Sequence, residues 1–150
     1  MRGARRPALA ALVLALLLPL VGCGESRIDA YCGDLDENRK QLAEMLDSSS
    51  PDALFSQIAV LRELAKKSPS DLDDEWRTFL GAVEGLRSAL TSAGVTAQEF
   101  GAGSTPAGLS AAEKDAIVSA ADQLSSDDVV AAASGIEQQA RDVCKVNLGL

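Results

Sequence analysis

Apolar residues recur three or four positions apart through most of the chain after residue 26, and this spacing constrains the fold more than any other feature. It is clearest over 72–90, where the apolar positions are Leu72, Trp76, Phe79, Val83, Leu86 and Leu90. That period matches one face of an α-helix, whereas a half-buried strand alternates at every second residue. Alanine and leucine are abundant, and alternation of β-branched or aromatic residues is nearly absent. We therefore predict an all-α protein.

Local start signals divide the chain into helices. The first helix is predicted over 27–47, and Ser50-Pro51 and Ser68-Pro69 precede the second and third. A serine hydroxyl caps free backbone amides, and proline suits the first helical position. Gly94 is placed to end the third helix, because glycine readily adopts the left-handed conformation that follows a helix.

Two more helices are predicted after a long connection. Residues 95–109 contain several glycines and Pro106 among small polar residues, which indicates a connection or mobile loop of unusual length. Ser110 and Glu113 then have capping-box spacing at the start of a short helix over 110–124. Ser125 and Asp128 offer a similar start to the last helix. The apolar stripe predicted for that helix is Val129, Ala133, Ile136, Ala140 and Val143.

The first residues have the character of an export signal. Three arginines and no acidic residue precede a wholly apolar run over 8–18. Such a run is typical of a signal peptide, since a membrane-spanning helix needs about 20 apolar residues and Pro19 interrupts this one. We predict that residues 1–22 are a signal peptide that is removed.

The motif Leu20-Val21-Gly22-Cys23 follows this run and resembles the lipobox of bacterial lipoproteins. The resemblance implies that the Cys23 thiol receives a diacylglyceryl group and that the signal peptide is cut between Gly22 and Cys23. Two acyl chains suffice for stable anchoring, whereas one gives only marginal membrane binding. The mature chain would then be held on the extracytoplasmic face of the cell membrane, with 23–26 as a short tether. The alternative is an ordinary secretory signal with an incidental cysteine.

With Cys23 assigned to lipid, Cys32 and Cys144 remain near the two ends of the mature chain. Export would place them where disulfides persist, so we expect a bond between them. In the chain-entropy model, closing a loop of roughly a hundred residues stabilises a fold by about 4 to 5 kcal/mol. The alternative is a pair of buried thiols. A redox role is disfavoured because neither cysteine belongs to a C-x-x-C motif.

The disulfide also predicts a topology. Cys32 lies near the start of the first helix and Cys144 near the end of the last, so those two ends must lie together. Strict up-and-down packing of five helices would separate them. We therefore predict an antiparallel bundle of about four helices, with the 110–124 helix as a short addition. The tether is short, at about 3.5 Å per residue, so the disulfide end should lie against the membrane.

Composition bounds the remaining possibilities. The signal holds three of the 14 basic residues and none of the 22 acidic ones, so the mature chain has a formal charge of −11. Such a surface repels phosphate backbones, and we expect no binding to nucleic acid. Residues 27–150 are long enough for one domain with a real core.

The chain offers little catalytic chemistry. Histidine is absent, which removes the commonest general base and metal ligand. The run 34–38 begins like a calcium loop, but Arg39 and Met45 occupy the positions that need glycine and glutamate. The acidic residues of 71–75 suit the first turn of a helix, with a cation site as the alternative. We predict no cofactor, no metal and no enzymatic activity.

Two further features have structural explanations. The glycines of 101–108 lack the spacing and lysine of a phosphate loop, so we interpret them as a flexible connection. Trp76 is the single tryptophan. We predict that it anchors the core with its indole N–H near the rim, and the alternative is that it forms the wall of a ligand pocket.

As a whole, the mature chain resembles small, alanine-rich, helical lipoproteins of actinobacteria. The resemblance rests on the lipobox, on Tyr31-Cys32 soon after it, on Glu75-Trp76 and on the ending Val143-Cys144-Lys145-Val146-Asn147-Leu148. It implies a compartment and an architecture, and no activity. Our leading hypothesis is a non-catalytic interaction or accessory module that binds an envelope protein or a cell-wall component. The alternative is a carrier of a small apolar ligand, held between helices under the 95–109 segment.

Overall fold

The computed structural model describes residues 26–48, 50–103 and 107–148. Within these ranges the chain forms seven α-helices and one short 3-10 helix, and it contains no strand. The elements are α1 (Arg27–Ser48), α2 (Pro51–Ser56), α3 (Ile58–Lys67), η1 (Ser70–Leu72), α4 (Asp73–Ser92), α5 (Ala97–Gly101), α6 (Ala111–Leu124) and α7 (Asp127–Asp142). The predicted all-α fold is confirmed. Gly22 and Cys23, the predicted cleavage and lipidation residues, lie outside the described residues.

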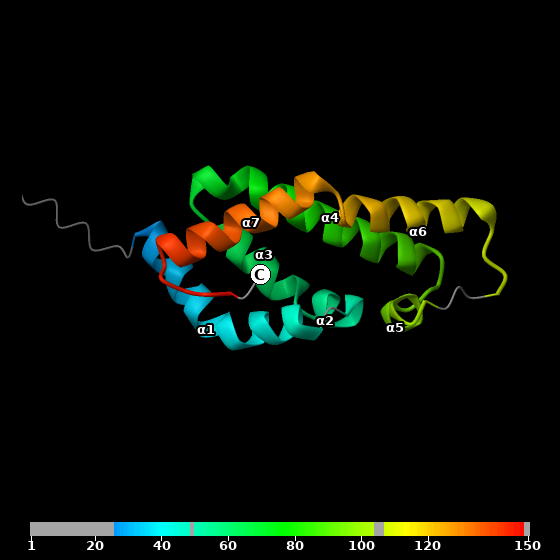
Figure 1. The fold of residues 1–150 in the computed structure, drawn as a ribbon, viewed down its shortest axis with the longest axis horizontal. Helices are drawn as coiled ribbons and strands as arrows, with labels where there is room; N and C mark the ends of the chain where they lie inside the picture. Colours follow the sequence, from blue (N-terminus) through cyan, green and yellow to red (C-terminus); the bar gives the residue numbers. More distant parts are fainter. Residues whose placement is uncertain (1–25, 49, 104–106, 149–150) are drawn as a thin grey trace, which may run out of the picture.

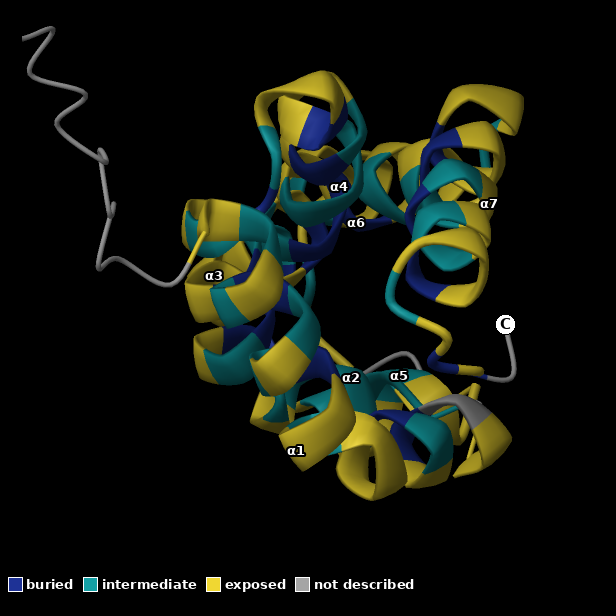
Figure 2. Ribbon diagram, turned by 90° about the vertical axis from the view of Figure 1, so that its left-hand side faces the viewer, coloured by how far each residue is buried: buried dark blue, intermediate teal, exposed yellow. Residues whose placement is uncertain are grey.

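The helices form four antiparallel legs, which are α1, α2 with α3, α4, and α6 with α7. Figure 1 shows α6 and α7 lying end to end along α4, and both helices pack extensively on it. In the end-on view of Figure 2, α1, α3, α4 and α7 surround a common interior. This arrangement agrees with the predicted antiparallel bundle but corrects one detail. The 110–124 helix is not an addition, because with α7 it forms the fourth leg and returns the chain to the end where it began.

The predicted second helix is in fact two helices, α2 and α3. The apolar stripe over 54–65 suggests one unbroken helix, but the chain bends at Gln57, which ends α2 and precedes α3. The backbone N–H of Gln57 donates to the carbonyl of Leu54, at 3.2 Å, in place of a regular helical bond. The bend lets the second leg contact α5 through α2 and both α1 and α4 through α3.

The end of α4 follows the prediction closely. Gly94 has φ +66° in the left-handed region that L side chains disfavour. The N–H of Val95 donates to the carbonyl of Leu90 at 2.9 Å, and that of Gly94 to Thr91 at 3.2 Å. These two bonds form a Schellman motif, and the motif's usual apolar contact is made by Val95 and Leu90, which are both buried in one core.

The segment 95–109 contains a helix where the sequence suggests only a connection. Thr96 caps α5 by accepting a hydrogen bond from the N–H of Glu99 at 3.2 Å, while the Glu99 carboxylate accepts one from the N–H of Thr96 at 2.9 Å. This capping box repeats the one that starts α6, where Ser110 and Glu113 pair in the same way, as predicted. The Thr96–Glu99 spacing is therefore the signal that predicts α5.

The start and end of α7 each differ by a small amount from the prediction. Its N-cap is Ser126, whose hydroxyl accepts from the N–H of Val129 at 3.4 Å, whereas Ser125 ends α6. Val143 is 51% exposed, because α7 ends at Asp142 and Val143 no longer belongs to the buried stripe.

The chain reverses after α7. Lys145 has φ +60°, and the N–H of Val146 donates to the carbonyl of Ala140 at 2.9 Å. This turn carries Val146 and Leu148 into the core, where both are nearly fully buried. The described part of this segment, up to Leu148, runs between α7 and α1 (Figure 2).

The apolar interior is divided into two cores. The disulfide core contains twelve buried residues from α1, α3, η1, α4, α7 and the C-terminal segment: Tyr31, Leu35, Leu42, Met45, Leu61, Leu64, Leu72, Trp76, Ile136, Ala140, Val146 and Leu148. The α5 core contains four buried residues from α4, α6 and the turn before α5: Leu86, Leu90, Val95 and Ile117. Partly buried residues, among them Phe55 and Phe100, cover this smaller core.

Candidate functional site

The disulfide joins the two ends of the fold as predicted. The Cys32 and Cys144 sulfur atoms are 2.01 Å apart, with a Cα–Cα distance of 5.0 Å and a sequence separation of 112 residues. The bond connects the first turns of α1 to the segment that follows α7. Both half-cystines are partly exposed at this end of the molecule, and the Cys144 sulfur lies 3.9 Å from Oε1 of Gln139. We interpret the bond as structural.

Trp76 is buried in the disulfide core, and its indole N–H is also buried, whereas the prediction placed that group near the rim. Its indole N–H donates to the Tyr31 hydroxyl at 3.3 Å, and the two rings meet edge to face with centroids 6.5 Å apart. Phe79 packs on the other side at 6.3 Å. Burial raises the pKa of the Tyr31 hydroxyl to about 12, although the hydrogen bond from Trp76 opposes this. Tyr31 and Trp76 therefore satisfy each other's polar groups inside the core, and the hydrogen bond fixes the relative orientation of the two rings.

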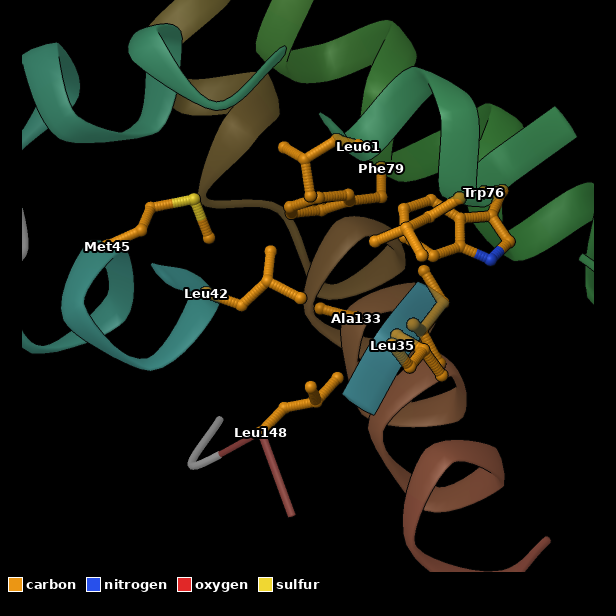
Figure 3. Close-up of a pocket in the computed structure, with 10 residues that line it drawn as sticks. Leu35, Leu42, Met45, Leu61, Trp76, Phe79, Ala133 and Leu148 are labelled. Atoms are coloured by element: carbon orange, nitrogen blue, oxygen red, sulfur yellow. The ribbon is translucent and has the colours of Figure 1, made fainter. Parts of the chain in front are cut away.

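Trp76 also lines a small internal cavity. Figure 3 shows the side chains of Leu42, Met45, Leu61 and Leu148 directed toward the same space as Trp76. The cavity has a volume of about 30 Å³, and all its lining side chains are apolar. A water molecule needs roughly 10 to 15 Å³ together with two or more polar partners. The cavity is thus a packing defect of the core, far smaller than the few hundred Å³ of a typical ligand site.

A much larger groove opens where the two cores meet. It has a volume of about 350 Å³ and is lined by Met45, Ser50, Pro51, Leu54, Leu86, Phe100, Ala121, Leu124 and Ser125. Met45 belongs to the disulfide core and Leu86 to the α5 core. Among the described residues, the lining contains no charged side chain, and its polar side-chain groups are the hydroxyls of the two serines. We call this feature the α5 groove.

The walls of the α5 groove come from elements that are distant in the sequence. The capping box of α5 places Phe100 in the lining, and α5 packs tightly on α2, since a Cβ atom at Gly101 would lie 3.3 Å from Cδ of Pro51. The opposite wall is Leu124 and Ala121 of α6. No single stretch of sequence carries this pattern, so it could not be predicted from the sequence.

A second depression lies between α4 and the α6–α7 junction, with acidic residues in its lining. It has a volume of about 370 Å³, and its lining includes Asp74, Glu75 and Asp128. The Glu75 carboxylate packs over Gly135, and its Oε2 atom is buried without a hydrogen-bond partner. Asp74 is instead engaged with Arg77 at 2.5 Å. Among the described residues, no group of three or more acidic or cysteine side chains is arranged to hold a metal ion.

The acidic run 34–38, which begins like a calcium loop in the sequence, lies on the surface of helix α1. Asp34 of α1 accepts a hydrogen bond from Nζ of Lys67 at 2.6 Å, and this bond raises the pKa of the lysine. Asp36 pairs with Arg39 one turn later at 3.7 Å. The run 34–38 therefore lies on a regular helix and ties α1 to the end of α3.

No protein-family model, curated protein or solved structure matches this chain. In the part of the chain that the structure describes, none of the helices combines the length and the apolar character needed to cross a membrane.

Proposed function

We propose that this chain is an exported lipoprotein, anchored through Cys23 on the extracytoplasmic face of the cell membrane, with a non-catalytic interaction role at the envelope. Under this proposal residues 1–22 are the removed signal, 23–26 the tether, and 27–150 a single binding domain. We further propose that the α5 groove is the binding surface. Its partner would be an envelope protein or a cell-wall component.

The observation that carries this proposal is the position of the groove. Helix α1 begins beside the disulfide, so a lipid attached through a short tether at Cys23 would hold that end toward the membrane. The α5 groove includes Met45 near the other end of α1, together with residues of α2, α5 and α6. Figure 1 shows α2 and α5 side by side at that end of α1. An apolar recess of this kind, away from the anchor, is where a tethered protein would meet a partner.

Metabolic labelling tests the anchor. Cells expressing the wild-type chain with a labelled palmitate analogue should incorporate label into the protein, and Cys23→Ala should abolish it. The double variant Cys32→Ser, Cys144→Ser is the matched control and should remain labelled, because neither residue lies in the lipobox. Label that persists in Cys23→Ala would contradict the anchor.

Site-specific photocrosslinking in intact cells tests the groove. A photoreactive phenylalanine in place of Phe100, within the groove, should give a discrete crosslinked product. The same residue in place of Val118, which is 57% exposed on α6 and outside the groove, is the control. Equal patterns at both positions, or no product at Phe100, would contradict a binding role for the groove.

A second candidate function is the carriage of a small apolar ligand. It is favoured by the volume of the groove, about 350 Å³, since ligand sites span roughly 300 to 1,000 Å³. Organic extraction of the purified protein followed by mass spectrometry should then recover a stoichiometric apolar compound, which Phe100→Ala should deplete. Extracts that contain none would remove this candidate.

A further inference from the structure

We infer that the α5 groove binds an amphipathic helix of a partner protein whose polar flanks are basic. This inference rests on the proposed binding role of the groove and adds the chemistry of the partner. It follows from an apolar groove whose lining residues have exposed acidic neighbours in the sequence, and from the uneven distribution of charge along the fold.

Four acidic residues lie one or two positions in the sequence from residues that line the groove, each on a different helix. Asp47 follows Met45 on α1 by two positions, and Asp52 is next to Pro51 on α2. Glu99 is next to Phe100 on α5, and Asp122 is next to Ala121 on α6. All four side chains are exposed. Helices α1, α2, α5 and α6 therefore each carry an exposed carboxylate within two positions of a residue that lines the groove.

The rest of this end of the molecule is also acidic. We define the α5 end as residues 41–57 and 86–128, which contain nine acidic and only two basic residues, Arg87 and Lys114. The remainder of the chain from residue 26 contains twelve acidic and nine basic residues. A charge this concentrated produces a local potential that attracts cations and repels anions.

Ion pairing within the fold neutralises little of this charge. Nine ion pairs join side chains of the described residues, and just one of them, Lys40–Glu44, includes an acidic residue of the α5 end. The others lie in the remainder of the chain, where twelve acidic residues are accompanied by nine basic ones. The exposed carboxylates of Asp47, Asp52 and Asp122 belong to none of these ion pairs, whereas that of Glu99 already accepts hydrogen bonds from Thr96.

A basic amphipathic helix fits both the apolar lining of the groove and the acidic charge of the α5 end. Helix-in-groove recognition places two or three apolar side chains, spaced three or four positions apart, into an apolar groove of limited size. Lysine and arginine on either side of that stripe would then face the carboxylates of Asp47, Asp52, Glu99 and Asp122. A fatty acid or a phosphate-bearing lipid would bring like charge to the same place. An uncharged ligand would contact only the apolar lining and would gain nothing from the acidic residues.

Peptide binding tests the inference. The probe is a fluorescent fourteen-residue helical peptide of leucine and lysine, and its control is the same peptide with glutamate at every lysine. The protein is the mature lipoprotein in phosphatidylcholine nanodiscs, with empty nanodiscs as the blank, and binding is followed by fluorescence anisotropy. We expect the basic peptide to bind, the acidic one not to bind, and binding to weaken as salt is raised.

Charge variants locate the contact. Asp47→Asn, Asp52→Asn and Asp122→Asn together should weaken binding of the basic peptide about tenfold, as expected for three exposed charge interactions. The matched triple Asp36→Asn, Glu37→Gln and Asp71→Asn, on the disulfide side, removes the same charge and should change the affinity less than about threefold. Equal losses in both triples would mean attraction by net charge only and would overturn the inference.

A phenylalanine pair tests the apolar part. Phe100 and Phe55 are both partly buried against the α5 core, but only Phe100 lines the groove. Phe100→Ala should weaken peptide binding several-fold more than Phe55→Ala, with thermal denaturation to show that both variants are folded. Equal effects would contradict docking in the groove.

One further measurement separates this inference from the proposed function. The uncharged fluorophore N-phenyl-1-naphthylamine binds apolar recesses without regard to surrounding charge. If it binds in a Phe100-dependent way while the basic peptide does not bind, the partner chemistry inferred here is wrong and the groove remains a binding site. If the photocrosslinking at Phe100 also fails, the proposed function fails with it.

Discussion

The two ends of the bundle are built from the same kind of helix but differ in how they are closed. At the disulfide end, twelve buried residues, an aromatic group around Trp76 and a covalent bond enclose a nearly filled core. At the α5 end, four buried residues are covered by partly exposed side chains, and an open groove separates them from the larger core. Stability is thus concentrated near the proposed anchor, and accessible apolar surface is concentrated away from it.

The distribution of charged residues also differs between the two ends. Acidic and basic side chains pair across the disulfide side, as in Asp34–Lys67 and Arg62–Glu84, both at 2.6 Å. Such exposed pairs contribute little stability individually. The α5 end carries a strong excess of acidic residues. The contrast indicates that the acidic composition of this protein is not spread evenly for solubility, and four measurements should sharpen or break the comparison.

The largest effect should come from the disulfide. Replacing Cys32 and Cys144 by serine releases a loop of 112 residues, and the chain-entropy model gives a loss of about 4 to 5 kcal/mol in the free energy of unfolding. Urea denaturation followed by circular dichroism would measure it, and reduction of the wild type should give the same midpoint as the double variant. An unchanged midpoint would show that packing alone holds the two ends together.

A matched pair of core substitutions compares the two ends directly. Leu35 is fully buried in the disulfide core, and Leu86 is equally buried but borders the groove. We expect Leu35→Ala to cost about 4 kcal/mol and Leu86→Ala about 2 to 3 kcal/mol, because neighbours or solvent can fill the space beside an open groove. Urea denaturation of both variants is the measurement. A larger loss in the free energy of unfolding for Leu86→Ala would contradict the inference that the disulfide end is the more stable of the two.

The pH dependence of stability should report on the disulfide core. An unfolded tyrosine has a pKa near 10, and burial raises that of Tyr31 to about 12. Because the folded pKa is the higher one, this contribution is complete below pH 10 and is lost between pH 10 and 12, by about 2 to 3 kcal/mol.

Tyr31 is the single tyrosine of the chain, so absorbance at 295 nm follows its ionisation without interference. The titration should be centred near pH 12 for the folded protein and near 10 in urea. A folded-state pKa of about 10 would mean that Tyr31 is open to solvent and that the disulfide core is looser than described.

The smallest effect concerns the junction of the two ends, where α6 meets α7. Ser126 caps α7 by accepting from the N–H of Val129, whereas the Ser125 hydroxyl donates to the carbonyl of Ala121 at 3.1 Å. Ser126→Ala should therefore cost about 1 kcal/mol, and Ser125→Ala much less. Thermal denaturation of the two variants distinguishes them. The reverse order would place the start of α7 one residue earlier.

Features that depend on neighbouring residues were predictable from the sequence. Gly94 ends α4 through its own conformation, and the Ser110–Glu113 spacing starts α6 through its own hydrogen bonds. The same reasoning applied to Thr96 and Glu99 would have identified α5, but the glycines that follow it suggested a loop. The error at Ser125 arose because adjacent serines offer the same side chain, and only the backbone geometry of the folded chain separates a C-cap from an N-cap.

Features that depend on distant residues were not predictable. The fourth leg consists of α6 and α7 together because both pack on α4, which is the longest helix in the middle of the chain. The α5 groove arises because α5 rests on Pro51 while α6 runs along α4, leaving Phe100 and Leu124 to line a space that the smaller core does not fill. Packing of this kind depends on the sizes of side chains far apart in the sequence.

The sequence by itself determined the helical class, most helix ends, the excess of acidic residues and the pairing of Cys32 with Cys144, because each depends on local periodicity, capping chemistry, composition or a cysteine count. Only the tertiary structure decided that the apolar interior is divided in two, that Trp76 is buried in one part, and that an apolar groove opens beside the other, at the end where acidic residues are in excess. These properties result from which helices touch, and that choice is made by the packing of the whole chain.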